Sequence, residues 1–160
     1  MRPYVICHMM PSVDGRLRTR RWDIPNTAHD EYERTAETFR ADAWVCGRKT
    51  MEEFASGRRR PRRGQVNLPL ALRKLREKFG VKRLLLEGGG ETNGSFLRAK
   101  LVNELSLLVT PVADGGIGEP ALFDVEGRRP ARAVARLALK SARRIGAGMV
   151  WLRYAVRNAH

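Results

Sequence analysis

The sequence predicts an α/β fold: a mixed, mostly parallel sheet with helices on both faces and a C-terminal antiparallel hairpin. Apolar, strand-like runs alternate with helical segments through the first two-thirds of the chain. Two further strand-like runs follow, separated by a glycine turn, as in a hairpin added to a sheet edge. The 160 residues, 42% of them hydrophobic, suffice for one core, so residues 1–160 are expected to form a single domain.

Short apolar runs define the expected strands. The first combines β-branched and aromatic residues and ends in a turn where Gly15 can adopt a positive φ. A run of leucines later in the chain ends in Glu87 and three glycines. With the closing hairpin, the pattern predicts strands at residues 4–10, 43–46, 84–87, 105–109, 134–142 and 149–156.

Capping residues and amphipathic spacing define the expected helices. Residues 27–30 have the Thr-x-x-acid form of a helix start. Asn67 offers an N-cap, and Gly80 ends the segment that follows it. The pattern predicts helices at residues 27–39, 48–55, 68–79 and 91–99, with a loop at 56–64.

The chain is strongly basic, with a formal net charge of +14 and 25 arginines against six lysines. Its densest runs are residues 16–21 and 58–63. A nucleic-acid interface would have aromatic residues among the cations, and only Trp22 lies near either run. A solvated, arginine-rich surface is therefore the first interpretation, with phosphate groups of a small ligand and nucleic acid as alternatives.

Composition also bears on location and on metals. No apolar run approaches the roughly 20 residues of a membrane span, and His8 interrupts the first apolar run before it reaches the length of a signal peptide. Cys7 and Cys46 are too few for a disulfide framework or a zinc site. These features predict a cytoplasmic protein without a metal, with both cysteines as small buried hydrophobes.

Three strand ends carry the residues best suited to bind a ligand, because ligands of open α/β sheets bind beyond the carboxyl ends of the strands. The three segments are Ser12-Val13-Asp14-Gly15, Gly47-Arg48-Lys49-Thr50 and Glu87-Gly88-Gly89-Gly90-Glu91-Thr92. If the strands are parallel, all three lie along one edge of the sheet.

The third segment is the most informative. Three glycines between a strand and a helix leave backbone N–H groups accessible at a helix N-terminus, which favours a phosphate or pyrophosphate. The strict G-x-G-x-x-G pattern fails because position 93 is Asn, and no Gly-Lys-Ser/Thr of a Walker loop follows. A tight turn without a ligand is the alternative.

The other two segments supply charge. Arg48 can form a forked contact with a phosphate such as the 2′-phosphate of NADP, and Thr50 can donate to a phosphate. Asp14 and Glu87 can hydrogen-bond a substrate or move a proton. An ordinary Asp-Gly turn is the alternative for Asp14, and a satisfied core histidine is the first interpretation of His8.

Taken in order, these motifs resemble the dihydrofolate reductase-like superfamily, and more closely the C-terminal reductase domain of the riboflavin-biosynthesis deaminase-reductase. The order is Ser-x-Asp-Gly-Arg, Gly-Arg-Lys-Thr, Glu-Gly-Gly-Gly and Thr-Pro-x-x-x-x-Gly, each at a strand end. The resemblance covers nearly the whole chain. It implies a three-layer sandwich, usually a homodimer, and an NADPH-dependent reductase acting on a small heterocyclic or carbonyl substrate, like 5-amino-6-(5-phosphoribosylamino)uracil reductase.

The resemblance also implies roles for individual residues. The cofactor's phosphates would be held by Gly47, Arg48, Lys49 and Thr50, and its pyrophosphate by Gly88, Gly89, Gly90, Glu91 and Thr92. The nicotinamide and substrate side would be lined by Ser12, Asp14 and Gly15, and Glu87 would face the substrate. Asp14 and Glu87 are the expected catalytic residues.

Two departures from the family pattern leave other functions open. The riboflavin reductases carry a lysine four residues before the Ser-x-Asp-Gly turn, where this chain has His8. The interval from Gly47 to Gly88 is short for the family, as if a strand were missing near residues 56–64. The alternatives to a reductase are a non-catalytic nucleotide-binding relative and an arginine-mediated nucleic-acid binder.

Overall fold

A six-stranded mixed sheet forms the centre of the computed structural model, which describes residues 1–17, 21–47, 66–124 and 134–157. Its strands, in the order β2-β3-β1-β4-β6-β5, are β1 (Tyr4–Met9), β2 (Ala43–Cys46), β3 (Arg83–Glu87), β4 (Glu104–Val109), β5 (Arg136–Arg144) and β6 (Val150–Arg157). The helices are α1 (Asn26–Glu37), α3 (Leu68–Phe79) and α4 (Gly90–Arg98).

The direction of the strands follows the prediction. β2, β3, β1 and β4 are parallel, whereas β6 runs antiparallel to β4 and to β5. The closing hairpin is thus confirmed at one edge, and β2 is the other edge strand among the described residues. The predicted helix at residues 48–55 and the expected shortening near residues 56–64 lie outside the described residues.

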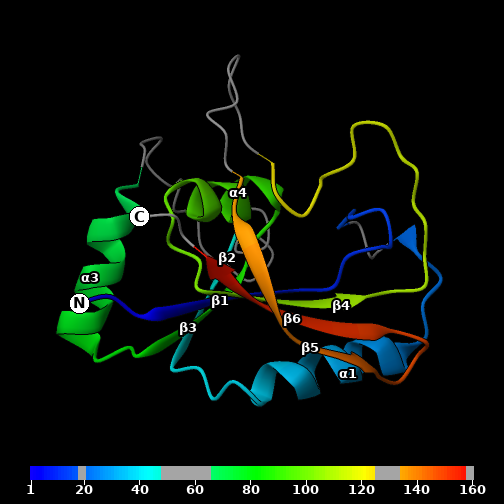
Figure 1. The fold of residues 1–160 in the computed structure, drawn as a ribbon, viewed down its shortest axis with the longest axis horizontal. Coiled ribbons are helices and arrows are strands. Elements are labelled where there is room, and N and C mark those ends of the chain that lie inside the picture. Colours follow the sequence, from blue (N-terminus) through cyan, green and yellow to red (C-terminus); the bar gives the residue numbers. More distant parts are fainter. Residues whose placement is uncertain (18–20, 48–65, 125–133, 158–160) are drawn as a thin grey trace, which may run out of the picture.

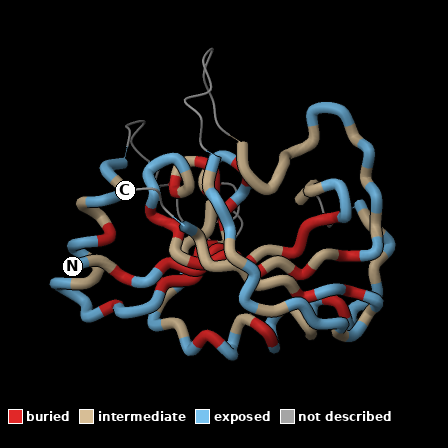
Figure 2. The backbone as a smooth tube through the Cα atoms, viewed as in Figure 1, coloured by how far each residue is buried: buried red, intermediate tan, exposed pale blue. Residues whose placement is uncertain are grey.

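Helices cover both faces of the sheet (Figure 1). α3 and α4 lie over one face, where Leu72 and Phe96 pack with alternate residues of β1 and β3 such as Val5 and Leu84. α1 lies under the other face, and Ala28 packs there. The buried residues gather along the central strands between these layers (Figure 2).

The capping residues predicted for α3 are confirmed, whereas the predicted start of α1 is not. Asn67 caps α3 by accepting a hydrogen bond from the N–H of Leu70, and Gly80 ends the helix in the left-handed region, as predicted. The Thr-x-x-acid start predicted at Thr27 is wrong. α1 begins at Asn26, and its N-cap residue is Pro25, whose ring has no hydrogen-bonding group, so no side chain caps the helix.

His8 lies in a buried polar network between the sheet and α1. Its Nδ1 is 2.9 Å from Ser106 Oγ, and its Nε2 is 3.2 Å from the carbonyl oxygen of Tyr32. Trp151 Nε1 donates to the same Ser106 oxygen, at 2.8 Å. Since a carbonyl can only accept, Nε2 carries the proton, and Ser106 donates to Nδ1. The imidazole is therefore a satisfied core histidine, as the sequence suggested.

This network makes stability depend on pH. Burial lowers the pKa of His8 to about 4 from its ordinary value of 6.5. Between these values the unfolded chain binds a proton that the folded protein does not, so the free energy of unfolding is highest above pH 6.5. It should fall by about 3 kcal/mol as the pH decreases to 4. Urea unfolding at a series of pH values measures this loss.

The control for that measurement is His29, which is exposed on α1. His8→Gln should flatten the pH dependence in this window, whereas His29→Gln should retain the wild-type slope. An NMR titration placing the His8 pKa at its ordinary value would contradict the assignment.

Candidate functional site

The three predicted strand ends lie at one edge of the sheet. Cys46 pairs with Glu87, and Cys7 pairs with Leu86, so the turns after β2, β3 and β1 emerge side by side. A Cβ atom added at Gly47 would lie 3.4 Å from the backbone nitrogen of Gly89. The structure therefore brings the first residue of the second segment against the glycine turn. The rest of that segment, Arg48, Lys49 and Thr50, lies outside the described residues.

The glycines of the third segment have different tasks. A Cβ atom at Gly90 would lie 2.4 Å from the carbonyl oxygen of Ala121, and one at Gly94 would lie 2.0 Å from that of Asp124. A Cβ atom at Gly88 would lie 2.6 Å from the Cβ of Thr92. These three glycines permit close packing of α4, whereas Gly89 has no atom within 4 Å of such a Cβ. Gly89 is therefore the glycine whose backbone a ligand can approach.

The N-terminus of α4 carries no side-chain cap. The N–H of Asn93 donates to the carbonyl oxygen of Gly89 at 3.0 Å, which is the first bond of the helix. The N–H groups of Gly90, Glu91 and Thr92 precede it and have no acceptor within the helix. Together with the helix dipole, this geometry suits an anion, although the exposed carboxylate of Glu91 lies in the same turn.

Asn93 explains why the dinucleotide pattern breaks at this position. Its side chain is fully buried, and its amide nitrogen donates to the carbonyl oxygens of Gly88, at 3.0 Å, and Leu122, at 3.2 Å. It thereby ties the glycine turn to the loop that follows β4, which a glycine could not do.

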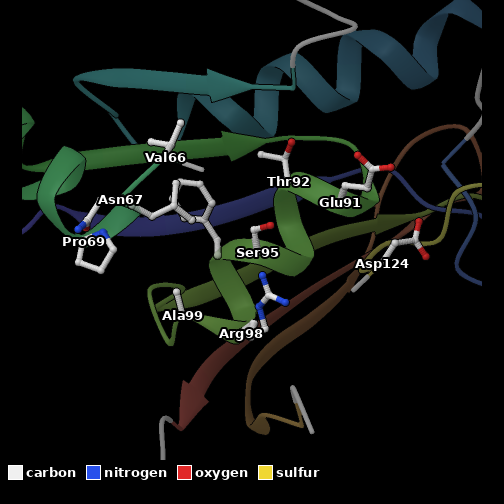
Figure 3. Close-up of a pocket in the computed structure, with 11 residues that line it drawn as sticks. Val66, Asn67, Pro69, Glu91, Thr92, Ser95, Arg98, Ala99 and Asp124 are labelled. Carbon is white, nitrogen blue, oxygen red and sulfur yellow. The ribbon is translucent and has the colours of Figure 1, made fainter. Parts of the chain in front are cut away.

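A cavity of about 830 Å³ opens beside this helix terminus, between α4 and the beginning of α3 (Figure 3). One wall is apolar and includes Leu68, Pro69 and Phe96. The polar lining comes from α4 and from the loop after β4, and consists of Glu91, Thr92, Ser95, Arg98 and Asp124, with Asn67 from the start of α3. Of the predicted site residues, Glu91 and Thr92 line it.

The sequence prediction missed the remaining lining residues. The start of α3 was recognised from Asn67 as a cap, but a cap does not indicate which helix lies opposite. Ser95 and Arg98 follow Glu91 at helical spacing on α4, which is a signal that could have extended the predicted site along one face of that helix.

Glu87 lies on the opposite face from this cavity. Leu85, two residues before it, packs on the α1 side of the sheet, and strand alternation places Glu87 there too. Burial raises the pKa of the Glu87 carboxyl, and the nearby phenol of Tyr32, which donates to the carbonyl oxygen of His8 at 3.0 Å, partly opposes the rise. Burial next to Glu87 also raises the pKa of the Tyr32 phenol. Glu87 thus retains its proton to a higher pH than an ordinary glutamate.

The first segment is occupied with internal hydrogen bonds. The hydroxyl of Ser12 donates to Asp14 Oδ1 at 2.7 Å and accepts from the N–H of Arg16 at 2.9 Å. Asp14 also accepts from the backbone N–H groups of Asp114 and Gly115, both at 2.9 Å. The bonds from Ser12 and from these two N–H groups lower the pKa of Asp14, so its carboxyl stays ionised. This geometry favours an acceptor over a proton donor.

The described residues also bear on metal binding, on thiol chemistry and on membrane insertion. They contain no group of three or more His, Cys, Asp or Glu side chains placed to bind one metal ion. Burial raises the pKa of the Cys7 thiol, which is fully buried. Within the part of the chain that the structure describes, no helix has both the length and the apolar character needed to cross a bilayer.

The division among the glycines gives a prediction for stability. Gly94→Ala should destabilise the fold by about 3 kcal/mol, because the new methyl group would overlap the backbone of Asp124. Gly89→Ala should change the free energy of unfolding by no more than about 1 kcal/mol, since φ is −72° and the space is open. Urea unfolding of both variants compares them. Equal losses in the free energy of unfolding would contradict the conclusion that Gly94 is needed for packing and Gly89 is not.

Comparison with known proteins connects this geometry to a family. Residues 56–151 match the RibD C-terminal domain. The chain is similar to 2,5-diamino-6-ribosylamino-4(3H)-pyrimidinone 5′-phosphate reductase of Methanothermobacter thermautotrophicus, with 35% identity over 103 residues, 64% of this chain and 45% of that protein. It is also 37% identical over 62 residues to the reductase of the same name from Aquifex aeolicus, covering 39% of this chain and 28% of that one. The matches thus span less than half the length of these curated relatives.

Solved structures agree on the fold. RibD of Acinetobacter baumannii superposes with a TM-score of 0.71 at 18% identity, over 98% of this chain and 58% of that one. A pyrimidine reductase-like protein of Corynebacterium diphtheriae superposes with a TM-score of 0.72 at 13% identity, over 98% of this chain and 93% of that one. These likenesses confirm the fold class predicted from the sequence.

Proposed function

Since the chain belongs to the RibD C-terminal domain family, we propose that it is an NADPH-dependent reductase that transfers a hydride to a small heterocyclic substrate. The observation that carries the proposal is the uncapped N-terminus of α4, which lies against Gly47 and opens into the cavity. The names of the curated relatives favour a phosphorylated ribosylaminopyrimidinone as the substrate class. They also favour a reductase over a nucleic-acid binder.

The size of the cavity and its hydrogen-bonding groups support the assignment of the cofactor to this site. The free N–H groups at the start of α4 suit a pyrophosphate, and the open space at Gly89 admits it. The cavity has the size of small-molecule sites and an apolar wall for the adenine ring, with the cation of Arg98 in its lining. We assign cofactor binding to Ser12, Gly15, Gly47, Arg48, Lys49, Thr50, Gly88, Gly89, Gly90, Glu91 and Thr92.

In this proposal the protein orients the bound molecules and supplies a proton to the substrate. When bound, NADPH supplies the hydride. Glu87, with its raised pKa and its place between the sheet and Tyr32, is the group proposed to donate a proton or a hydrogen bond to the substrate. The catalytic role predicted for Asp14 remains a prediction. The hydrogen bonds that Asp14 accepts from the N–H groups of Asp114 and Gly115 point instead to a role in holding the backbone of these two residues in place.

Two further expectations remain predictions. We expect a homodimer, as the resemblance implies, which analytical ultracentrifugation of the purified protein would detect. We also expect a cytoplasmic location, as the composition of the sequence predicts.

Cofactor binding is tested directly. NADPH at about 100 times its dissociation constant should raise the free energy of unfolding by about 2.7 kcal/mol, because the ligand binds only the folded state. Gly89→Ala should weaken NADPH binding about ten-fold, because its methyl group occupies the space assigned to the phosphates. Titration followed by nicotinamide fluorescence measures both. Absence of any response to millimolar NADPH would overturn the proposal.

Proton supply is tested at Glu87. Glu87→Gln retains the shape of the side chain but removes its titrating proton, so kcat for the pyrimidinone phosphate should fall about 100-fold. The affinity for NADPH should remain unchanged, because Glu87 lies on the other face from the cavity. The wild-type rate should decrease as the pH rises through the elevated pKa of Glu87, and this limb should disappear in the variant. A limb that persists would exclude Glu87 as the titrating group.

A further inference from the structure

The loop that follows β4 connects two parts of the proposed site that are far apart in the sequence. Residues 111–124, here called the strap, run from the turn after β1 to the first turn of α4 (Figure 1). Only the Thr-Pro-x-x-x-x-Gly motif of the sequence analysis reaches the strap, which contains its residues from Pro111 to Gly116. It lies in the described part of the chain and is bonded at both ends.

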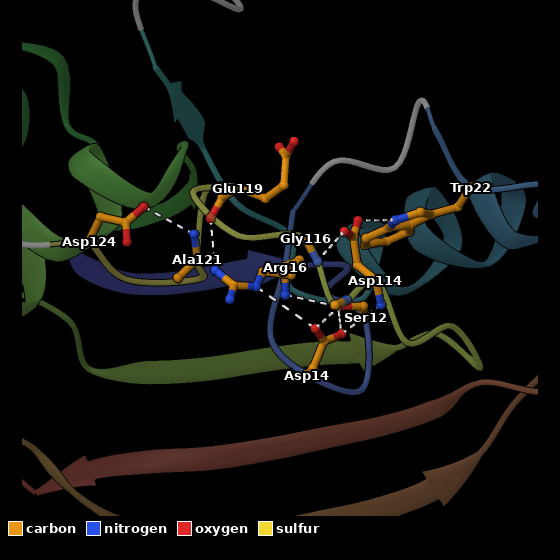
Figure 4. Close-up of polar contacts among 10 residues, drawn as sticks. Ser12, Asp14, Arg16, Trp22, Asp114, Gly116, Glu119, Ala121 and Asp124 are labelled. Carbon is orange, nitrogen blue, oxygen red and sulfur yellow. Dashed lines mark hydrogen bonds and ion pairs between the residues drawn. The ribbon is translucent and has the colours of Figure 1, made fainter.

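At its first end, the strap is held by the turn after β1 (Figure 4). Both carboxylate oxygens of Asp14 accept from consecutive strap amides, those of Asp114 and Gly115, at 2.9 Å each. The hydroxyl of Ser12 fixes the carboxylate at 2.7 Å, and Trp22 Nε1 donates to Asp114 Oδ2 at 2.6 Å. The Asp14 carboxylate therefore holds the strap backbone here, together with the N–H of Val13, which donates to the carbonyl oxygen of Val112 at 2.8 Å.

In its middle, the strap pairs with the chain that leads away from Asp14. The N–H of Leu17 donates to the carbonyl oxygen of Pro120 at 3.1 Å, and the N–H of Leu122 donates to that of Gly15 at 2.9 Å. The guanidinium of Arg16 donates to the carbonyl oxygen of Glu119 at 2.8 Å. These bonds form a short antiparallel contact between the turn and the strap.

At its far end, the strap sets the position of α4. The N–H of Asp124 donates to the carbonyl oxygen of Gly90 at 2.9 Å. The absence of side chains at Gly90 and Gly94 lets the helix approach the backbone at Ala121 and Asp124. A shift of the strap would therefore displace the helix turn whose free N–H groups face the proposed phosphates.

We propose that Asp14 is a positioning residue of the cofactor site, acting through the strap on the N-terminal turn of α4. The proposal rests on the proposed function, in that this turn binds the cofactor. Asp14 does so without touching the cofactor phosphates, because its oxygens are engaged by Ser12 and by the strap amides. The turn after β1 and the N-terminal turn of α4 thereby stay at a fixed distance from each other.

The chain offers a matched control for Asp14. Asp42 is also an exposed carboxylate that accepts from two consecutive backbone amides, those of Lys82 and Arg83, at 2.7 and 2.8 Å. It precedes β2, at the opposite end of the strands from the candidate site. Asp42→Asn therefore removes the same kind of interaction without involving the strap.

The experiment compares Asp14→Asn with Asp42→Asn in two measurements. The first is the dissociation constant for NADPH, which should rise about ten-fold in Asp14→Asn and by less than about two-fold in Asp42→Asn. The second is amide hydrogen exchange without ligand. Asp14→Asn should accelerate exchange in the strap and at Asn93, the first bonded amide of α4, whereas Asp42→Asn should accelerate it only near Lys82 and Arg83.

The outcomes separate this inference from the proposed function. If wild-type protein fails to bind NADPH, the cofactor proposal fails, whereas faster exchange in Asp14→Asn at Asn93, whose N–H is bonded to Gly89, would still support the coupling through the strap. If exchange rises in the strap alone and the dissociation constant is unchanged, the coupling is overturned. Equal weakening of NADPH binding by both variants would also overturn it, because the effect would then be general destabilisation.

Discussion

The approach of α4 to the strap is the constraint on which the proposed site depends. The helix can lie against the backbone of residues 121–124 because positions 90 and 94 carry no side chain. This contact holds the first turn of α4 at the end of β3, next to Gly47, which follows the neighbouring strand β2. The helix terminus then faces outward with its N–H groups available, which is the property that an anionic ligand requires.

The proposed site uses groups on both faces of the sheet. On the α4 side lie the cavity and the uncapped helix terminus, which suit the phosphates and the base of a dinucleotide. On the α1 side lies Glu87, where burial and Tyr32 set the protonation of its carboxyl. The two faces therefore supply different groups: the helix terminus for the proposed cofactor phosphates, and Glu87 for the proposed substrate.

Buried polar groups on the α1 side are satisfied internally. His8 lies where the riboflavin reductases carry a lysine, and it is held by Ser106 and Tyr32 instead of facing a ligand. Farther along the same face, the carboxylate of Glu104 binds Lys140 at 2.6 Å and Arg153 at 2.7 Å, which joins the closing hairpin to β4. The departure at His8 therefore changes the core as well as the group available to a substrate.

The amino-acid sequence by itself determined the local features. Alternating apolar runs predicted the strands, Asn67 and Gly80 predicted the limits of α3, and the glycines after Glu87 predicted an exposed helix terminus, because each is a property of neighbouring residues. Tertiary structure decided which glycine stays open, that Asp14 binds amides 100 residues away, and that α3 and α4 enclose a cavity. These features arise from contacts between segments distant in the sequence, and no local pattern records which segments will meet.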